Sequence, residues 1–215
     1  MKSVLLTGFE PFDRETVNPS IEAVLAVEAA GICGVRLVTA ELPCAFDTSA
    51  EQMRRLLEQH RPDLIVAVGQ AGGRTELTLE RVAINLDDAR IPDNAGAQPI
   101  DRPVVAGGPA AYFSSLPLKA TVQALRKGGI PASVSYTAGT FVCNHLFYAL
   151  MHEVATLQRV CRAGFVHVPY LPAQAAAHPG QPSMALATMV EGLRLVVSTA
   201  LSVAQDTRES AGQLH

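Results

Sequence analysis

Cys143 lies where a polar, glycine-containing turn gives way to an apolar helical pattern, in SYTAGTFVCNHLFYALMHEV at 135–154. In the first turn of a helix the backbone N–H groups are unpaired and the helix dipole is positive. This environment lowers the pKa of a thiol from about 8.5, and the same N–H groups can bind an oxyanion. Packing of a small buried side chain is the alternative. Position alone leaves both open.

A thiolate mechanism needs a base, and His167 is the best placed of six histidines. It stands in GFVHVPYLP, where Pro169 ends a predicted strand. The carboxyl ends of parallel strands border the binding crevice of an open sheet, and Cys143 also follows such a strand. His145 is nearer in sequence, but two helical positions differ by about 200°, so it points away from the thiol. A hydrogen-bonded core histidine is the alternative. The other four are His60, His152, His178 and His215.

A carboxylate that orients the imidazole is expected in ELTLERVAINL at 76–86. Strand alternation places Glu80 on the same face as Thr78, Val82 and Ile84. A glutamate buried on a largely apolar face needs a partner. The alternative is an edge strand with this face in water, and periodicity does not exclude it.

Motifs for nucleotides and metals are missing. VGQAGGR is not GxGxxG, because Ala71 occupies the second glycine position, and there is no GxxxxGK[ST]. There is no HExxH and no repeated Cys/His spacing. We therefore expect neither a metal nor a cofactor.

The composition indicates a globular protein, because 48% of the 215 residues are apolar and 17% are charged. A net charge of −3 gives no basic surface for nucleic acid or an anionic membrane. The most apolar segment, Met184–Ala204, carries Glu191 and Arg194 and does not read as membrane-spanning. No secretory signal is visible, and the four cysteines form no CxxC pair. We therefore expect the cysteines to be free thiols and the protein to be cytoplasmic.

The elements that must position these side chains alternate along the chain. Short apolar runs predict strands at 2–8, 34–42, 63–69, 131–137 and 163–169. Helical patterns lie between several of them, at 20–30, 47–60, 118–129 and 146–157, and a last apolar stripe runs from Val190 to Ala204. Asn18 and Pro19 form a helix start, and Asp47 and Ser115 are expected at two others.

This alternation predicts a single α/β domain over 1–205, an open twisted, mainly parallel sheet flanked by helices. The segment 76–86 is expected as an inserted or antiparallel strand. The stretch 87–109 is rich in Pro, Gly, Asp and Asn and predicts a long functional loop. Residues 206–215 are expected to form a flexible tail.

Four segments together resemble the pyroglutamyl peptidase I (pyrrolidone carboxyl peptidase) family. GQAGGRTELTLERVAIN, followed by DARIPDN, and SYTAGTFVCN are similar to its glutamate and cysteine signatures. TGFEPF…NPS and FVHVPYLPAQ match as well, in the right order over nearly the whole chain. The resemblance implies a thiol peptidase that removes N-terminal pyroglutamate through a thioacyl-enzyme. It also implies a fold related to that of the purine nucleoside phosphorylases, and a homo-oligomer, either a tetramer or a dimer.

The resemblance also implies roles for individual residues. The family's nucleophile, base and orienting carboxylate fall on Cys143, His167 and Glu80, and its oxyanion arginine falls on Arg90. Its substrate pocket falls on Phe9, Phe12, Gln70, Phe141 and Val142. Pyroglutamate is a neutral, flat lactam without a free amine, so apolar walls with a few polar groups suit it.

Two departures affect the loops near this pocket. The family commonly has glycine after FEPF, where this chain has Asp13 and Arg14, and often an acidic residue at Ala173. Two rival functions remain, since fold alone does not carry function. A phosphorylase-like transferase would need phosphate and survive thiol alkylation, and a silent binding protein would not need all three catalytic residues.

Overall fold

Six strands form the central sheet in the order β2-β1-β3-β8-β4-β7 in the computed structural model, which describes residues 1–156 and 161–212. Strands β1, β2, β3 and β8 run parallel to one another. Strand β4 is antiparallel to β8, and β7 is parallel to β4. The predicted mainly parallel α/β sheet is confirmed. The strands are β1 (Lys2–Phe9), β2 (Val35–Leu42), β3 (Leu64–Gln70), β4 (Leu77–Glu80), β7 (Ala132–Ser135) and β8 (Arg162–Val168).

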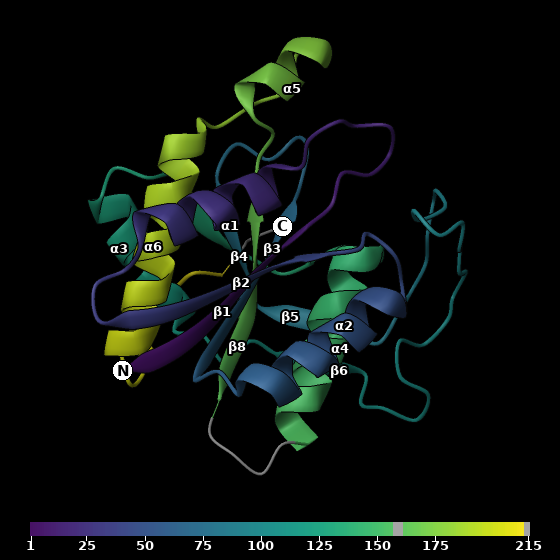
Figure 1. Cartoon of the computed structure of the whole chain (residues 1–215), viewed down its shortest axis with the longest axis horizontal. Helices are drawn as coiled ribbons and strands as arrows, with labels where there is room; N and C mark the ends of the chain where they lie inside the picture. The colour runs from purple at the N-terminus through teal and green to yellow at the C-terminus, as the bar shows by residue number, and fades with distance from the viewer. Residues whose placement is uncertain (157–160, 213–215) are drawn as a thin grey trace.

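Helices cover both faces of the sheet (Figure 1). One face carries α1 (Pro19–Ala30), α3 (Leu118–Lys127) and α6 (Leu186–Ser202), and α6 packs against the other two. The other face carries α2 (Thr48–His60) and α4 (Val142–Thr156), which pack together. A two-stranded ladder of β5 (Val82–Ile84) and β6 (Ala111–Phe113) lies against α4. The short helix α5 (Pro172–Ala177) follows β8 and, like β6, was not predicted.

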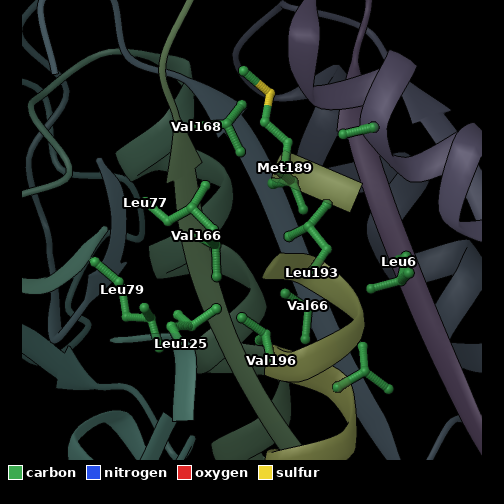
Figure 2. Close-up of a cluster of buried hydrophobic side chains, with 14 of the residues drawn as sticks. Leu6, Val66, Leu77, Leu79, Leu125, Val166, Val168, Met189, Leu193 and Val196 are labelled. Atoms are coloured by element: carbon green, nitrogen blue, oxygen red, sulfur yellow. The ribbon is translucent and has the colours of Figure 1, made fainter. Parts of the chain in front are cut away.

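The apolar core under α6 decides which way the strands face. Figure 2 shows Leu77 and Leu79 of β4 and Val166 of β8 pointing into the cluster formed with α6. Because strand side chains alternate, Glu80 and His167 project to the opposite face, on the side of α4. The packing of one face therefore places both polar side chains on the other.

The segment 76–86 was predicted as a single strand, and this prediction is wrong. The chain leaves the central sheet at Arg81, between β4 and β5. The Arg81 N–H donates to the carbonyl of Ser135, and its carbonyl accepts from Ser114 N. Beyond this point β5 pairs with β6 instead of continuing β4. Val82 and Ile84 therefore do not share a sheet face with Glu80. The predicted antiparallel pairing is confirmed for β4 and β8.

Strand β7 runs opposite to β8, because it is parallel to β4 and β4 is antiparallel to β8. Cys143 was expected to follow a strand, and His167 to close another, at one edge of a parallel sheet; this expectation is therefore wrong. Residues 136–141 lead from β7 to α4, with Gly139 at a φ of 78°. Thr140 fastens this turn, since its carbonyl accepts from Asp88 N and its hydroxyl donates to Asp88 O.

Helix starts differ in how well the sequence predicted them. The Asn18 side chain accepts from Ser20 N at 3.0 Å, which confirms that cap. Asp47 makes no such bond, and the Ser115 hydroxyl donates instead to Ala163 O. The start of α3 is capped by Asp206, whose carboxylate accepts from the N–H groups of residues 119 and 120.

The flexible tail predicted for 206–215 stays a prediction, and its last three residues, including His215, lie outside the described residues, as does Leu157. Within residues 1–156 and 161–212, no helix combines the length and apolar character needed to cross a membrane.

Candidate active site

A buried imidazole and a buried carboxylate meet on the α4 side of the sheet. His167 Nδ1 lies 2.7 Å from Glu80 Oε1, and the two residues are 3% and 0% exposed. The antiparallel register sets Thr78 opposite His167, so Glu80, two residues further along β4, projects from the same face. The predicted partner for a buried glutamate is therefore this histidine. With a carboxylate as its acceptor, Nδ1 carries the proton, and the lone pair of the neutral ring is on Nε2.

Arg74 is the third member of this cluster, and the sequence reasoning missed it. Its Nη1 lies 2.6 Å from Glu80 Oε1 and also contacts the Thr78 hydroxyl. Its Nη2 donates to the carbonyl of Thr137 at 3.0 Å. The sequence did contain a signal for it. A buried carboxylate needs a partner, and an arginine stands six positions before Glu80, in the loop before β4.

The charges of these groups set their protonation. Burial acts to raise the pKa of the Glu80 carboxyl, but the hydrogen bond with His167 and the charges of His167 and Arg74 lower it below its ordinary value. Burial lowers the pKa of His167, Glu80 raises it less, and Arg74 lowers it further. At neutral pH the pair is therefore a carboxylate and a neutral imidazole.

Cys143 is the second residue of α4, in the first turn as predicted. Its sulfur lies against Gly69 of the central strand β3. A Cβ added at Gly69 would lie 2.8 Å from Cys143 Sγ and 2.8 Å from the ring of Phe165. Gly69 is the partner of His167 in the β3–β8 ladder. The missing side chain at Gly69 therefore makes room for the thiol beside the strand that carries the imidazole.

The prediction that the pKa of this thiol is lowered is wrong. Cys143 is partly exposed, yet the loss of water around its sulfur and the charge of Glu80 raise its pKa to about 12, against a smaller lowering by Arg74. A protonated thiol is not a nucleophile. The thiol therefore needs a base, and the neutral imidazole of His167 is one.

Two of the five predicted pocket residues come together at the turn before α4. The ring centroids of Phe12 and Phe141 are 6.2 Å apart, although these residues lie far apart in the sequence. Phe46 packs edge-on against Phe141, with 5.3 Å between the ring centroids. The turn after Phe12 has φ values of 51° at Asp13 and 65° at Arg14. Glycine adopts this left-handed backbone most readily, so the departure from the family pattern falls where glycine fits best.

The other predicted pocket residues have different surroundings. Phe9 is 2% exposed and packs against Phe165, whose ring in turn contacts His167 at 4.9 Å. Val142 is fully buried. Gln70 Oε1 accepts from Gln174 of α5 at 3.0 Å. Their roles in substrate binding stay predictions.

Arg90 is exposed and lines a pocket of about 330 Å³ that borders the turn before α4. The lining includes neither the Cys143 thiol nor the Glu80–His167 pair. Its role as an oxyanion donor stays a prediction. The pocket is lined by Asp88, Arg90, Ile91, Gly139, Thr140 and Phe141.

His145 points away from the thiol, as predicted. Its Nδ1 lies 3.0 Å from both carboxylate oxygens of Asp87. In the described part of the chain, no three or more His, Cys, Asp or Glu side chains come together in a way that could hold a metal ion.

A thiol beside a hydrogen-bonded imidazole–carboxylate pair, on a mostly parallel α/β sheet, is the arrangement of a cysteine-type hydrolase. Comparison with known proteins specifies the family. The family model for pyroglutamyl peptidase matches residues 2–203. The chain belongs to the pyroglutamyl peptidase family, and it is a cysteine peptidase.

Relatives and solved structures agree over the whole or nearly the whole length. The pyrrolidone-carboxylate peptidase 1 of Ralstonia nicotianae is 61% identical over all of both chains. The crystal structure of Bacillus amyloliquefaciens pyroglutamyl peptidase I has a TM-score of 0.93 and 48% identity, covering 96% of this chain and 100% of that one. A mutant pyrrolidone carboxyl peptidase from Pyrococcus furiosus has a TM-score of 0.90 and 37% identity, covering 94% and 99%.

Proposed function

We propose that this enzyme removes pyroglutamate from the N-terminus of peptides, with Cys143 as nucleophile, His167 as base and Glu80 as the group that orients His167. The observation that carries the proposal is the 2.7 Å contact between His167 and Glu80, with the Cys143 sulfur packed over Gly69 on the neighbouring strand. Each residue was ambiguous by itself in the sequence. Their meeting on one face of the sheet favours catalysis over packing.

The first half of the reaction forms a thioester. His167 Nε2 takes the proton from the Cys143 thiol as the sulfur attacks the carbonyl carbon of the pyroglutamyl bond. The negative charge on the carbonyl oxygen is received by N–H groups of the first turn of α4, with Arg90 as a further donor. The intermediate then collapses, the C–N bond breaks, and His167 gives its proton to the departing amine. Glu80 stabilises the imidazolium meanwhile.

The second half returns the enzyme to its starting state. Water enters and loses a proton to His167 Nε2 as its oxygen attacks the thioester carbon. The C–S bond breaks, pyroglutamate leaves with its new carboxyl group, and the thiol regains the proton. Because the thiol pKa is raised to about 12, this mechanism relies on proton transfer during attack rather than on a resting thiolate.

The pocket is proposed to recognise a neutral lactam by apolar walls. Phe12 and Phe141, supported by Phe9 and Val142, supply the walls, and Gln70 supplies a polar group. An N-terminal glutamate would bring two uncompensated charges into this space, at a cost of several kcal/mol. We expect a preference for pyroglutamate over glutamate of at least about a thousandfold, since each 1.4 kcal/mol is tenfold.

The test is kcat/KM for pyroglutamyl-, glutamyl- and prolyl-coumarinylamide, with and without iodoacetamide. We expect activity on the first substrate alone, and its loss on alkylation. Comparable rates on glutamyl and pyroglutamyl substrates would contradict the apolar pocket even if Cys143 proved catalytic. Activity that requires phosphate and survives alkylation would favour the phosphorylase-like alternative.

The physical state of the enzyme follows only from the resemblance and the composition. We propose a homo-oligomer, either a tetramer or a dimer, located in the cytoplasm. Sedimentation velocity at micromolar concentration would measure the first property. Cell fractionation would measure the second.

A further inference from the structure

Two donors converge on one oxygen of the buried Glu80 carboxylate. His167 Nδ1 lies 2.7 Å from Oε1, and Arg74 Nη1 lies 2.6 Å from the same atom. Hydrogen bonds in which the donor, the acceptor or both are charged are stronger than neutral ones and favour one orientation of the acceptor. A carboxylate held from two directions cannot rotate away from the imidazole without losing both contacts.

The guanidinium of Arg74 is itself held from three sides. Besides Glu80, it contacts the Thr78 hydroxyl on the same strand and donates to the carbonyl of Thr137 in the turn before α4. Its backbone N–H donates to Ala71 O, within the loop that follows β3. One side chain therefore joins the strand that carries Glu80 to the turn that leads to Cys143.

The charge of Arg74 also acts on the three residues proposed for catalysis. It lowers the pKa of Glu80, of His167 and of Cys143. The charged groups that act on His167 are Glu80 and Arg74, and the same two act on Cys143. Those that act on Glu80 are His167 and Arg74, with the Ser135 hydroxyl adding a smaller effect.

We propose that Arg74 is a positioning residue that holds the Glu80 carboxylate against His167 and balances its charge, so that His167 remains a neutral base as the pH falls. This inference rests on the proposed catalytic roles of Glu80, His167 and Cys143. It adds a residue that touches none of the reacting atoms and acts through Glu80. A purely structural role would affect folding but not the pH dependence of turnover.

Arg74→Gln separates the charge from the shape of the side chain. With the cation gone, the negative charge of Glu80 is unbalanced and the pKa of His167 rises. We expect the acid limb of kcat/KM to move to higher pH by about one unit, the lower end of the effect of a nearby charge. Thermal unfolding of the same preparation shows whether the variant is folded. A folded Arg74→Gln enzyme with an unmoved acid limb would overturn the inference.

Arg74→Lys keeps the charge but cannot reproduce the planar fork of the guanidinium. We expect an acid limb within a few tenths of a unit of the wild type and a kcat reduced several-fold, with KM unchanged. A wild-type kcat in Arg74→Lys would remove the positioning part of the inference. If Arg74→Gln does not fold, this variant still tests the positioning part of the inference through its kcat.

Arg81→Gln is the matched control, because Arg81 adjoins Glu80 in the sequence but its guanidinium lies over the ring of Tyr136, 5.8 Å from the centroid. We expect no movement of its acid limb, and a shift equal to that of Arg74→Gln would show that any nearby positive charge suffices. A fully active Glu80→Gln enzyme would contradict the proposed function itself. Loss of activity in Glu80→Gln with an unmoved limb in Arg74→Gln would contradict this inference alone.

Discussion

The protein contains two histidine–carboxylate pairs of nearly the same construction on the α4 side of the sheet. In one, His167 lies 2.7 Å from Glu80, which also binds Arg74. In the other, His145 lies 3.0 Å from Asp87, which also binds Arg102. Both carboxylates are fully buried, and both imidazoles are nearly so. An arginine–carboxylate–histidine chain is therefore not sufficient to define an active site.

The two pairs differ in what surrounds the imidazole. His167 belongs to the strand whose neighbour, Gly69, leaves room for the Cys143 thiol. His145 packs edge-on against Phe46 at 5.4 Å, and its Nε2 lies 4.0 Å from a second carboxylate, Asp47. One imidazole lies on the strand next to the glycine that makes room for a thiol, and the other lies between an aromatic ring and a second carboxylate.

The His145 pair fastens a loop to the helix that carries the thiol. Asp87 and Arg102 exchange backbone hydrogen bonds of 2.7 and 3.0 Å, which close the loop between them. His145, two residues after Cys143, ties this loop to α4 through Asp87. Arg90 lies within the same loop. We infer that this pair holds the loop against α4, whereas the catalytic role is proposed for the His167 pair.

The largest expected effect is that of Cys143→Ala, which removes the thiol that lies near the His167 pair. We expect no measurable turnover of pyroglutamyl-coumarinylamide, because neither imidazole can replace the nucleophile. Cys33→Ala, Cys44→Ala and Cys161→Ala serve as controls and should keep most of the activity. Turnover by a folded Cys143→Ala enzyme would show that the nucleophile is elsewhere.

The second test substitutes the two carboxylates by their amides. Glu80→Gln keeps the shape but removes the charge that stabilises the imidazolium, so we expect kcat/KM to fall by about a hundredfold or more. Asp87→Asn should instead reduce the free energy of unfolding by about 1–3 kcal/mol, because it weakens buried contacts to His145 and Arg102. Its kcat/KM should fall far less than that of Glu80→Gln. Equal losses of activity in two folded variants would mean that both pairs take part in the reaction.

The smallest effect concerns pH. The pKa of His167 in the folded enzyme is below its ordinary value of 6.5, so we expect the acid limb of kcat/KM to lie below pH 6.5. Stability has the same sign: the unfolded chain binds this proton more readily, so the free energy of unfolding decreases as pH falls below about 6.5. Glu80, whose pKa is lowered, adds stability above its unfolded pKa of about 4.3, and this is lost as pH falls through the folded value.

Measurements of kcat/KM between pH 4 and 8 would locate the acid limb, and urea unfolding over the same range would give the pH dependence of the free energy of unfolding. His167→Gln removes the contribution of His167 to that dependence. His145→Gln is the comparison on the second pair. An acid limb above pH 6.5 would mean that the charge of Glu80 outweighs burial at His167.

The sequence by itself determined the local features of this enzyme. The apolar runs indicated the parallel strands, and the change of pattern near Phe141 indicated the start of α4. Strand alternation placed Glu80 on the same face as Thr78, but wrongly extended that face to Val82 and Ile84. These are consequences of periodicity within short segments, which the chain carries without knowledge of its neighbours. The family signatures added the roles of Cys143, His167 and Glu80 as expectations.

Only the tertiary structure decided which polar groups meet. Glu80 joins His167 across 87 positions, and Asp87 joins His145 across 58, although sequence spacing would have allowed other pairings. The end of β4 at Arg81, the reversal of β7 and the contact of Arg74 with Glu80 all depend on pairing between segments that are distant in the chain. The raised pKa of the Cys143 thiol has the same origin, because burial by remote segments is its largest cause, followed by the charge of Glu80. The local pattern sets the direction in which a side chain points, and the packing of distant segments sets which groups it contacts.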